Sequence, residues 1–354
     1  MEYEVDYLPV GEGSKGGDAI ALRYGDLSDP QKQIVVIIDG GTKESGKALV
    51  NHVKEYYKTN FVDLVVSTHL HRDHASGLTE VLNGLNVGKL AMHLPWDHAA
   101  NIKSMFSDGR VKVSTIETKL EKSLITISEL QKIAEEKKIE IIEPFAGMPL
   151  LENLFIIGPS KEYYEQLLAN FENTPKIKEE FNIAIDTLKT IAEKTINWVK
   201  EEIGMETETL RDSDEDTTPE NNTSVILLLI VGDKKLLFTG DSGKGGLYKA
   251  IQYTANLNVP LNDLTFLDVP HHGSRRNIEP SILAKIDAKT AFISAPREGD
   301  PKHPSRKVVN ALIRRNTNVI TTKNGIICHH SPGAPIRNKW QPISSLEIFP
   351  EVEE

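Results

Sequence analysis

Cysteine is almost absent from the 354-residue sequence, because Cys328 is its only example. One thiol can form neither an intrachain disulfide nor a thiolate zinc site, and we expect a reducing, cytoplasmic location. Long apolar runs are also missing, and the longest, residues 225–231, is far too short to span a bilayer. Residues 1–10 begin with charges and alternate, which predicts a strand and not a signal peptide. We therefore expect no membrane partner.

An excess of basic residues is missing as well. The formal net charge of −10 argues at first against a nucleic-acid partner. Residues 206–220 hold seven acidic residues and one arginine, however, so the remainder of the chain carries only −4. Global charge therefore does not decide the substrate.

Buried strands alternate with an amphipathic helix in the first part of the chain. Residues 33–41 form an apolar run that ends in a glycine pair, residues 45–58 have helical spacing, and residues 61–69 form a second apolar run. This alternation predicts an α/β sandwich with ligands gathered at strand ends. Strands return after Asn222, whereas amphipathic helices are expected at 113–138 and 177–204. We expect residues 1-96 and 223-354 to be two halves of one domain. Residues 97-222 would be a helical insertion with a mobile acidic loop at 204-222.

A cluster of metal-binding residue types follows the run that ends near residue 68. It contains His69, His71, Asp73 and His74, and imidazole with carboxylate suits Zn²⁺, Mn²⁺ or Fe²⁺. In an extended loop His69 and His71 project to one side and can share an ion, while Asp73 and His74 can reach a second ion. The alternative is a set of solvated loop histidines.

The C-terminal half contains the further ligands that two ions need. "LLFTGD" ends an expected strand in Asp241, whose carboxylate could bridge two metals, although a helix N-cap is the alternative. "LDVPHHGS" ends another strand with His271 and His272.

In this order these motifs resemble the metallo-β-lactamase fold of hydrolases. The similarity is closest to the soluble hydrolase domain of the ComEC type of DNA-uptake protein. It is carried by "PVGEGSKGGDAIAL", "IDGG", "NNTSVILLLIVGDKKLLFTGD", "PHHGS", "KHPSRKVVNAL" and "TTKNGII". The resemblance implies an αββα four-layer sandwich, interrupted here by the helical insertion.

The same resemblance implies roles for individual residues. His69 and His71 would hold the first metal, Asp73, His74 and His272 the second, and Asp241 would bridge them. His271 would face the substrate or support another ligand. Many relatives supply a third histidine to the first metal, but no histidine lies between residues 98 and 271. His93 could substitute, although a structural role is the alternative. We expect one or two ions of Zn²⁺ or Mn²⁺, with the first weakly held.

The expected reaction is hydrolysis by metal-activated water, with Asp73 and His271 as catalytic residues. Beyond the histidine pair, Ser274, Arg275, His303 and Ser305 are candidate substrate-binding residues that suit a phosphate. For Ser305, capping the helix is the alternative.

These residues predict a phosphodiesterase or nuclease acting on DNA, RNA or a nucleotide. A metallohydrolase of small esters, lactams or thioesters is the first alternative. The second is a binding module in a larger assembly, such as a defence system, that uses the helical insertion as a surface for a protein partner or for self-association.

Overall fold

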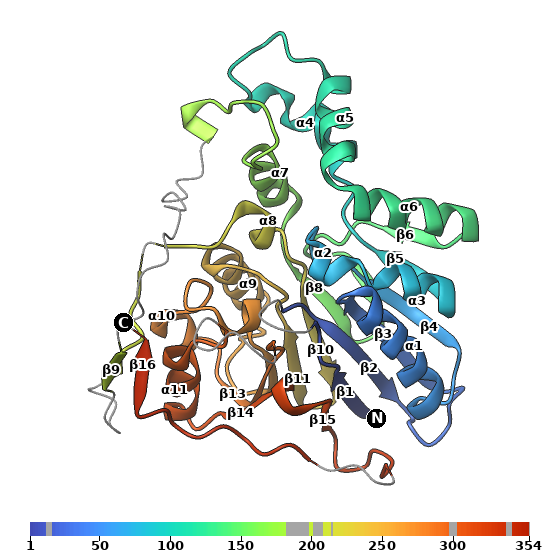
Figure 1. Cartoon of the computed structure of the whole chain (residues 1–354), viewed down its shortest axis with the longest axis vertical. Coiled ribbons are helices and arrows are strands. Elements are labelled where there is room, and N and C mark those ends of the chain that lie inside the picture. The colour runs from blue at the N-terminus through green and yellow to red at the C-terminus, as the bar shows by residue number, and fades with distance from the viewer. Residues whose placement is uncertain are drawn as a thin grey trace.

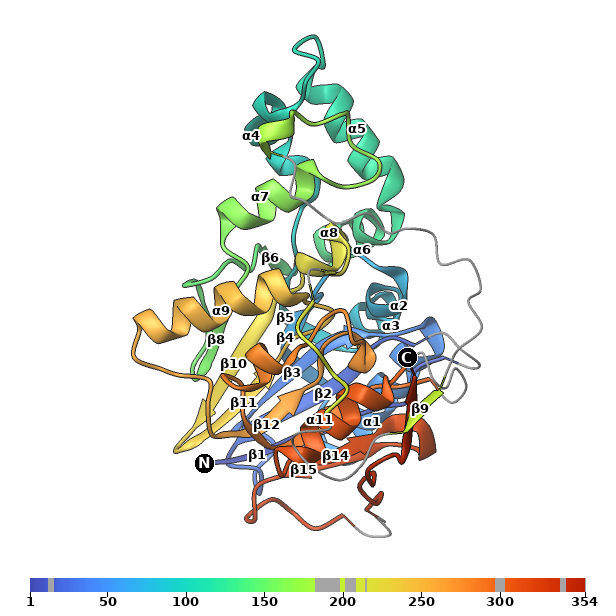
Figure 2. The ribbon, with the colours of Figure 1, turned by 90° about the vertical axis from the view of Figure 1, so that its left-hand side faces the viewer.

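Two seven-stranded sheets run through the centre of the structure, as Figures 1 and 2 show from two directions. The computed structural model describes residues 1–11, 16–181, 198–200, 208–213, 215–296, 303–337 and 342–353. The first sheet has the order β15 (Ile327–His330), β1 (Glu2–Tyr7), β2 (Ala19–Gly25), β3 (Gln33–Gly40), β4 (Phe61–Val66), β5 (Asn86–Ala91) and β6 (Glu140–Ile142).

The second sheet contains strands from the middle and the C-terminal part of the chain. Its order is β14 (Asn318–Thr321), β13 (Ala288–Ile293), β12 (Leu264–Asp268), β11 (Lys234–Phe238), β10 (Ile226–Val231), β8 (Leu154–Gly158) and β7 (Pro149–Leu151). A separate two-stranded sheet pairs β16 (Glu351–Glu353) with β9 (Trp198–Lys200).

Helices cover the outer face of each sheet. The first sheet is covered mainly by α1 (Lys43–Tyr56), α2 (Arg72–Ala75), α3 (Leu78–Gly84) and α6 (Ile125–Lys137), and the second by α9 (Lys244–Asn256), α10 (Pro280–Leu283) and α11 (Arg306–Arg314). Farther from the sheets lie α4 (Ala99–Ile102), α5 (Val113–Ser123) and α7 (Lys161–Ala169), while α8 (Pro219–Asn222) lies between α7 and α9. Short 3₁₀ turns are η1 (Pro95–His98), η2 (Lys103–Met105), η3 (Glu179–Phe181), η5 (Pro270–Gly273) and η6 (Thr322–Asn324).

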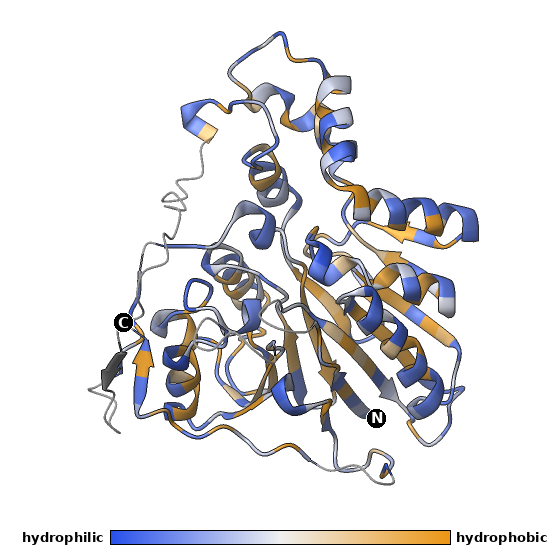
Figure 3. Ribbon diagram, in the orientation of Figure 1, coloured by the Kyte–Doolittle hydropathy of each residue, from blue (hydrophilic) through white to orange (hydrophobic). Residues whose placement is uncertain are grey.

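Both faces of the central strands are apolar because each face is buried. In β3, Val35 and Ile37 pack in the core under the helices, whereas Val36 and Ile38 pack in the core between the sheets. Successive side chains of a strand point to opposite faces, so a strand covered on both sides reads as a continuous apolar run. Figure 3 shows the resulting apolar centre. The predicted αββα four-layer sandwich is confirmed.

Strand direction determines where the polar side chains gather. The pairs β3–β4 and β11–β12 are parallel. The loops that follow β3 and β4 therefore emerge at the same end of the first sheet, at the carboxyl ends of its parallel strands. The loops that follow β11 and β12 likewise emerge at the same end of the second sheet. The three expected ligand segments, residues 69–74, Asp241 and residues 271–272, belong to the loops after β4, β11 and β12.

The expected helical insertion at 97-222 needs a correction, because it is not helical throughout. Residues 140–158 form β6 at an edge of the first sheet and β7 and β8 at an edge of the second. The central sheets thus include part of the segment that we assigned to the insertion. Helices α5 and α6 occupy the predicted 113–138 region, but most of the helix expected at 177–204 lies outside the described residues.

The described part of the acidic loop packs against the domain instead of lying free in solvent. Glu208 forms an ion pair with Arg315 at 2.7 Å, and Asp216 accepts hydrogen bonds from the backbone N–H groups of Lys244 and Gly245 at the start of α9. A carboxylate at that position satisfies unpaired N–H groups and interacts well with the helix dipole. The acids of this loop therefore stabilise particular elements.

Within the described ranges, no helix has both the length and the apolar character needed to cross a membrane.

His98 connects the helical projection, which consists of α4, α5 and α7, to the rest of the domain. Its Nδ1 lies 2.8 Å from a Glu165 carboxylate oxygen and its Nε2 lies 3.0 Å from one of Glu143. Burial alone would lower the pKa of His98, but the two carboxylates raise it above its ordinary value. A raised folded pKa stabilises the protein fully below the unfolded value of about 6.5, and this contribution is lost as pH rises through the folded pKa.

We predict that His98→Gln lowers the free energy of unfolding at pH 6 and has a smaller effect at pH 9. Urea unfolding of both proteins at several pH values measures the difference, and comparison with wild type cancels the titration of the other histidines. An equal loss of stability at pH 6 and pH 9 would contradict stabilisation by a charged His98 paired with Glu143 and Glu165.

Candidate metal centre

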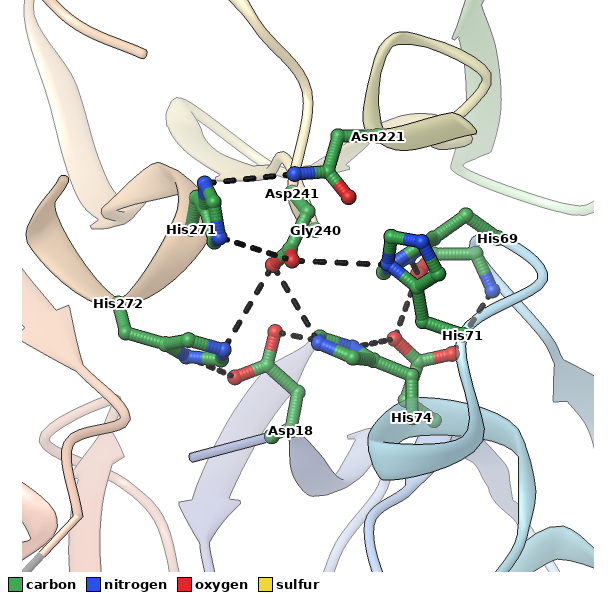
Figure 4. Close-up of polar contacts among 12 residues, drawn as sticks. Asp18, His69, His71, His74, Asn221, Gly240, Asp241, His271 and His272 are labelled. Carbon is green, nitrogen blue, oxygen red and sulfur yellow. Dashed lines mark hydrogen bonds and ion pairs between the residues drawn. The ribbon is translucent and has the colours of Figure 1, made fainter. Parts of the chain in front are cut away.

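Six buried or half-buried residues from both halves of the chain surround one carboxylate, that of Asp241 (Figure 4). They lie before β2, after β4 and after β12, and Asp241 itself follows β11. The set is Asp18, His69, His71, His74, His271 and His272.

The loop after β4 is shaped by Asp39, which lies at the end of β3. The Asp39 carboxylate accepts hydrogen bonds from the backbone N–H of Thr68 at 2.8 Å and from its hydroxyl at 2.5 Å. It also accepts one from Nδ1 of His74 at 2.8 Å. That bond leaves Nε2 of His74 as the free nitrogen and aims it at Asp241.

One oxygen of Asp241 faces the first donor group. Oδ2 lies 3.6 Å from Nε2 of His69, and that nitrogen lies 3.1 Å from Nδ1 of His71. Donor atoms of these three residues all lie within 4.8 Å of one another. The structure therefore brings together the residues predicted for the first metal.

The other oxygen of Asp241 faces the second donor group. Oδ1 lies 3.4 Å from Nε2 of His74 and 3.8 Å from Nε2 of His272. Asp73 is exposed, but one of its carboxylate oxygens lies within 4.8 Å of donor atoms of His74 and His272. Asp241 thus offers a different oxygen to each group, as the predicted bridging role requires.

The donor atoms fit divalent ions. Two ligand atoms about 2.1 Å from a tetrahedral metal are about 3.4 Å apart, which is close to the spacings around Asp241. Among the described residues, the buried atoms Asp241 Oδ1 and His74 Nε2 have no hydrogen-bond partner. A buried polar atom without a partner is costly, so a shared ion gives these two atoms a physical role.

The electrostatics also suit a cation site. Burial alone would raise the pKa of Asp241, but the surrounding histidines, His74 most strongly, hold it well below its ordinary value. Burial lowers the pKa of His69 well below 6.5, which keeps that imidazole neutral. For His272, Asp241 and Asp18 outweigh burial and raise the pKa to about 9. In the metal-free protein, protons therefore supply part of the positive charge that these carboxylates attract.

Two acidic residues of the site were not assigned roles from the sequence. Asp18 has one carboxylate oxygen 3.5 Å from Nδ1 of His272 and the other 3.7 Å from Nδ1 of His74. Asp39 holds Thr68 and His74, as described above. Asp18 lies in the motif "GGDA" and Asp39 in "IDGG", and both motifs carried the family resemblance. The motifs therefore marked these two residues, but they did not indicate what each carboxylate contacts.

The predicted substrate-binding residues fall into two groups. The ring centroid of His303 lies 5.5 Å from that of His271, so His303 is near the site, whereas Arg275 is exposed three residues after His272. Ser274 and Ser305 are buried. The Ser305 hydroxyl bonds to the Glu353 carboxylate of β16, which also accepts the backbone N–H of Arg306. This carboxylate occupies the helix start where we expected a phosphate, and it argues against substrate binding by Ser305.

The alternative third ligand, His93, belongs to another part of the molecule. Its ring stacks on Tyr164 with centroids 4.1 Å apart and packs against Phe145 at 4.9 Å. Burial lowers the pKa of His93 to about 3, so this ring is neutral. These contacts are those of a structural residue.

The layered fold and the donor set are those of a metallohydrolase. A sequence model of the metallo-beta-lactamase superfamily matches residues 31–296, and the chain belongs to this family.

One curated relative and two solved structures show what the chain resembles. ComE operon protein 3 of Bacillus subtilis (strain 168) is 31% identical over 113 residues, which is 32% of this chain and 14% of that protein. A Thermotoga maritima protein assigned to the metallo-beta-lactamases is 13% identical, with 68% of this chain and 79% of that chain covered and a TM-score of 0.34. CmlA, a diiron beta-hydroxylase from Streptomyces venezuelae, is 11% identical; the match covers 88% of this chain and 47% of CmlA, with a TM-score of 0.35.

The loop of residues 67–77 that follows β4, here called the metal loop, depends on a close backbone contact at Gly77, directly before α3. A Cβ there would lie 1.9 Å from the carbonyl oxygen of Gly40 and 2.4 Å from that of Thr42. We predict that Gly77→Ala costs about 2–3 kcal/mol, because backbone atoms must move to relieve this overlap. Gly109→Ala is the matched control, since nothing lies within 4 Å of its added Cβ. Equal urea midpoints for the two variants would contradict the close contact.

Proposed function

We propose that the protein is a metal-dependent phosphodiesterase or nuclease that hydrolyses its substrate with metal-activated water. The observation that carries the proposal is the placement of Asp241, whose two carboxylate oxygens face two separate groups of histidines. A carboxylate shared in this way can hold two ions a few Å apart, an arrangement suited to phosphodiester hydrolysis.

We assign the ligands as the geometry groups them. His69 and His71 would hold the first ion, His74 and His272 the second with Asp73, and Asp241 would contact both. Asp18 lies against His272 and His74 and orients their rings. When bound, divalent ions lower the pKa of water and neutralise charge on a phosphoryl group. All of these donors are nitrogen or oxygen, which suits Zn²⁺ or Mn²⁺.

Asp73 has a second role in this proposal. Its carboxylate is exposed at the start of α2, while His74 and His272 beside it are buried. An accessible carboxylate next to the ligand group can accept the proton of the attacking water. The ring centroid of His303 lies 5.5 Å from that of His271, so His303 is placed to contact the substrate as it binds.

A cavity of about 260 Å³ beside the metal loop favours a phosphodiester over a small neutral ester. Its polar lining residues include the cations Lys43 and Arg72, one acid, Glu129, and the hydroxyl-bearing Ser76, Ser123 and Thr126. Arg72 directly follows the ligand His71, and the other wall comes from the α5–α6 junction of the helical projection. We infer that a phosphate next to the scissile one binds there. The partial similarity to ComE operon protein 3 supports the same branch of the family.

We predict that Asp241→Asn lowers hydrolysis of bis-p-nitrophenyl phosphate by at least about a hundredfold, because even the supporting partners of metal ligands contribute ~10–100-fold. The assay uses protein loaded with Zn²⁺ or Mn²⁺, and Asp263→Asn, at an exposed position, is the control. Wild-type protein that cleaves lactams, esters or thioesters and leaves this phosphodiester intact would support the first alternative. Full activity of Asp241→Asn would contradict the metal mechanism.

We predict that Arg72→Ala and Lys43→Ala raise KM for a single-stranded oligonucleotide about tenfold each and leave hydrolysis of bis-p-nitrophenyl phosphate unchanged. Each variant should also reduce the dependence of oligonucleotide binding on salt. Lys54→Ala, at the far end of α1, is the matched control for Lys43. Equal effects on both substrates would show that these cations do not bind a neighbouring phosphate.

A further inference from the structure

From the sequence, His271 was expected to face the substrate or to support another ligand, but its hydrogen bonds indicate a different role. We infer that His271 supplies the third imidazole of the first metal position and that Asn277 holds it in the tautomer that binding requires. The inference rests on the proposed metal centre, and it replaces the histidine that many relatives provide from a region where this chain has none.

The hydrogen bonds of Asn277 fix its orientation. Its side chain is fully buried, and its amide nitrogen donates to the carbonyl oxygens of Asp241 at 2.9 Å and Ser242 at 3.2 Å. The amide oxygen of Asn277 must therefore be the atom that lies 2.9 Å from Nδ1 of His271. An amide oxygen only accepts, so Nδ1 of His271 carries the proton and donates it.

The free nitrogen of His271 then points at the metal centre. With the proton on Nδ1, Nε2 of the neutral ring has an exposed lone pair, and it lies 3.6 Å from Oδ2 of Asp241. No hydrogen bond can join these two acceptors. A common cation can join them, as in other sites where a partner on one ring nitrogen prepares the other for a metal. The amide nitrogen of Asn221 is 3.4 Å from Nδ1, too far to compete with Asn277.

Four histidine rings approach the Asp241 carboxylate, two at each of its oxygens. Oδ2 lies 3.6 Å from His69 and 3.6 Å from His271, while Oδ1 lies 3.4 Å from His74 and 3.8 Å from His272. Each oxygen therefore faces one histidine from each half of the chain. In Figure 4 the rings of His271 and His272 approach Asp241 from separate positions.

The backbone at the histidine pair is bent to make this possible. His271 and His272 have φ values of 49° and 55°, in the left-handed region that residues other than glycine rarely adopt. Each residue in this region is destabilising, because its Cβ crowds the following carbonyl oxygen. The backbone N–H of His271 donates to the Gly240 carbonyl oxygen at 3.1 Å, which fixes the bend beside Asp241. Directing both rings at the same carboxylate accounts for the strain.

The inference changes what we expect of the metal content. Donor atoms of His69, His71 and Asp241 lie within 4.8 Å of one another, and His271 approaches the same Asp241 oxygen, so it would add the third imidazole of a tetrahedral set. We therefore expect two ions per chain, where the sequence led us to expect a weakly held first ion.

The test is metal binding by the whole protein without substrate, with Zn²⁺ and Mn²⁺ as probes. Isothermal titration of wild-type protein and elemental analysis after desalting should show two ions per chain. His271→Ala should retain one ion and bind the other about a hundredfold more weakly or worse. His303→Ala, which removes the ring 5.5 Å from that of His271 and is not one of the proposed ligands, should still bind two.

Asn277→Ala tests the positioning role separately. This variant keeps the His271 ring but frees its tautomer, so the first ion should bind about 10–100-fold more weakly, and excess metal should restore two ions per chain. Circular dichroism of each variant confirms that it is folded. If Asn277→Ala does not fold, the comparison of His271→Ala with His303→Ala still decides the assignment of the ligand.

Two ions held by His271→Ala with wild-type affinity would overturn the inference, as would a single ion in wild-type protein. Because these titrations contain no substrate, their outcome is independent of whether the protein cleaves phosphodiesters. A phosphodiesterase assay that fails beside two bound ions would reject the proposed substrate and leave the ligand assignment in place.

Discussion

The buried carboxylate of Asp241 is the interaction on which the rest of the site depends. A carboxylate that is almost completely removed from water is costly unless positive charge or hydrogen-bond donors surround it. Two imidazoles from the loop after β4 and two from the turn after β12 face this carboxylate, so each sheet contributes two of the rings that stabilise its negative charge. The carboxyl ends of two strand pairs, one in each sheet, must therefore stay aligned for Asp241 to remain ionised.

Much of the site could be predicted because its residues follow apolar runs at short, regular spacing. His69, His71 and His74 follow one strand, while Asp241 and His272 follow two others, and strand ends can be recognised from sequence. The contacts of Asp18, Asp39 and Asn277 could not be predicted, because they depend on which buried groups face each other across the two sheets. The direction of the His271 ring depends on a left-handed backbone turn, which the sequence "PHHG" does not predict.

The middle of the chain was harder to predict for two physical reasons. β6 and β7 have three residues each and β8 has five, so their apolar periodicity is too short to stand out from the flanking helices. The acidic stretch looked like a solvated loop because its composition is polar. Its acids nevertheless find specific partners, such as Arg315 for Glu208 and the start of α9 for Asp216. Composition shows how polar a segment is, but it does not show whether each charge has a partner in the fold.

A group of buried acidic residues beside the histidines would favour cation binding at the proposed metal centre. Asp18, Asp39 and Asp241 are buried there, whereas burial and the charge of Asp18 raise the pKa of the equally buried Asp268 to about 8, so Asp268 is mainly neutral near pH 7 and adds little charge. In the metal-free protein these carboxylates draw protons onto His74 and His272, whose pKa values are raised by their acidic neighbours in spite of burial. In the proposed centre, divalent ions would bring more charge to the same place and bind the same nitrogen atoms, so metal and protons would compete directly. The acids that anchor the loops would thus also determine the affinity of this centre for metal, and weakening one function would weaken the other.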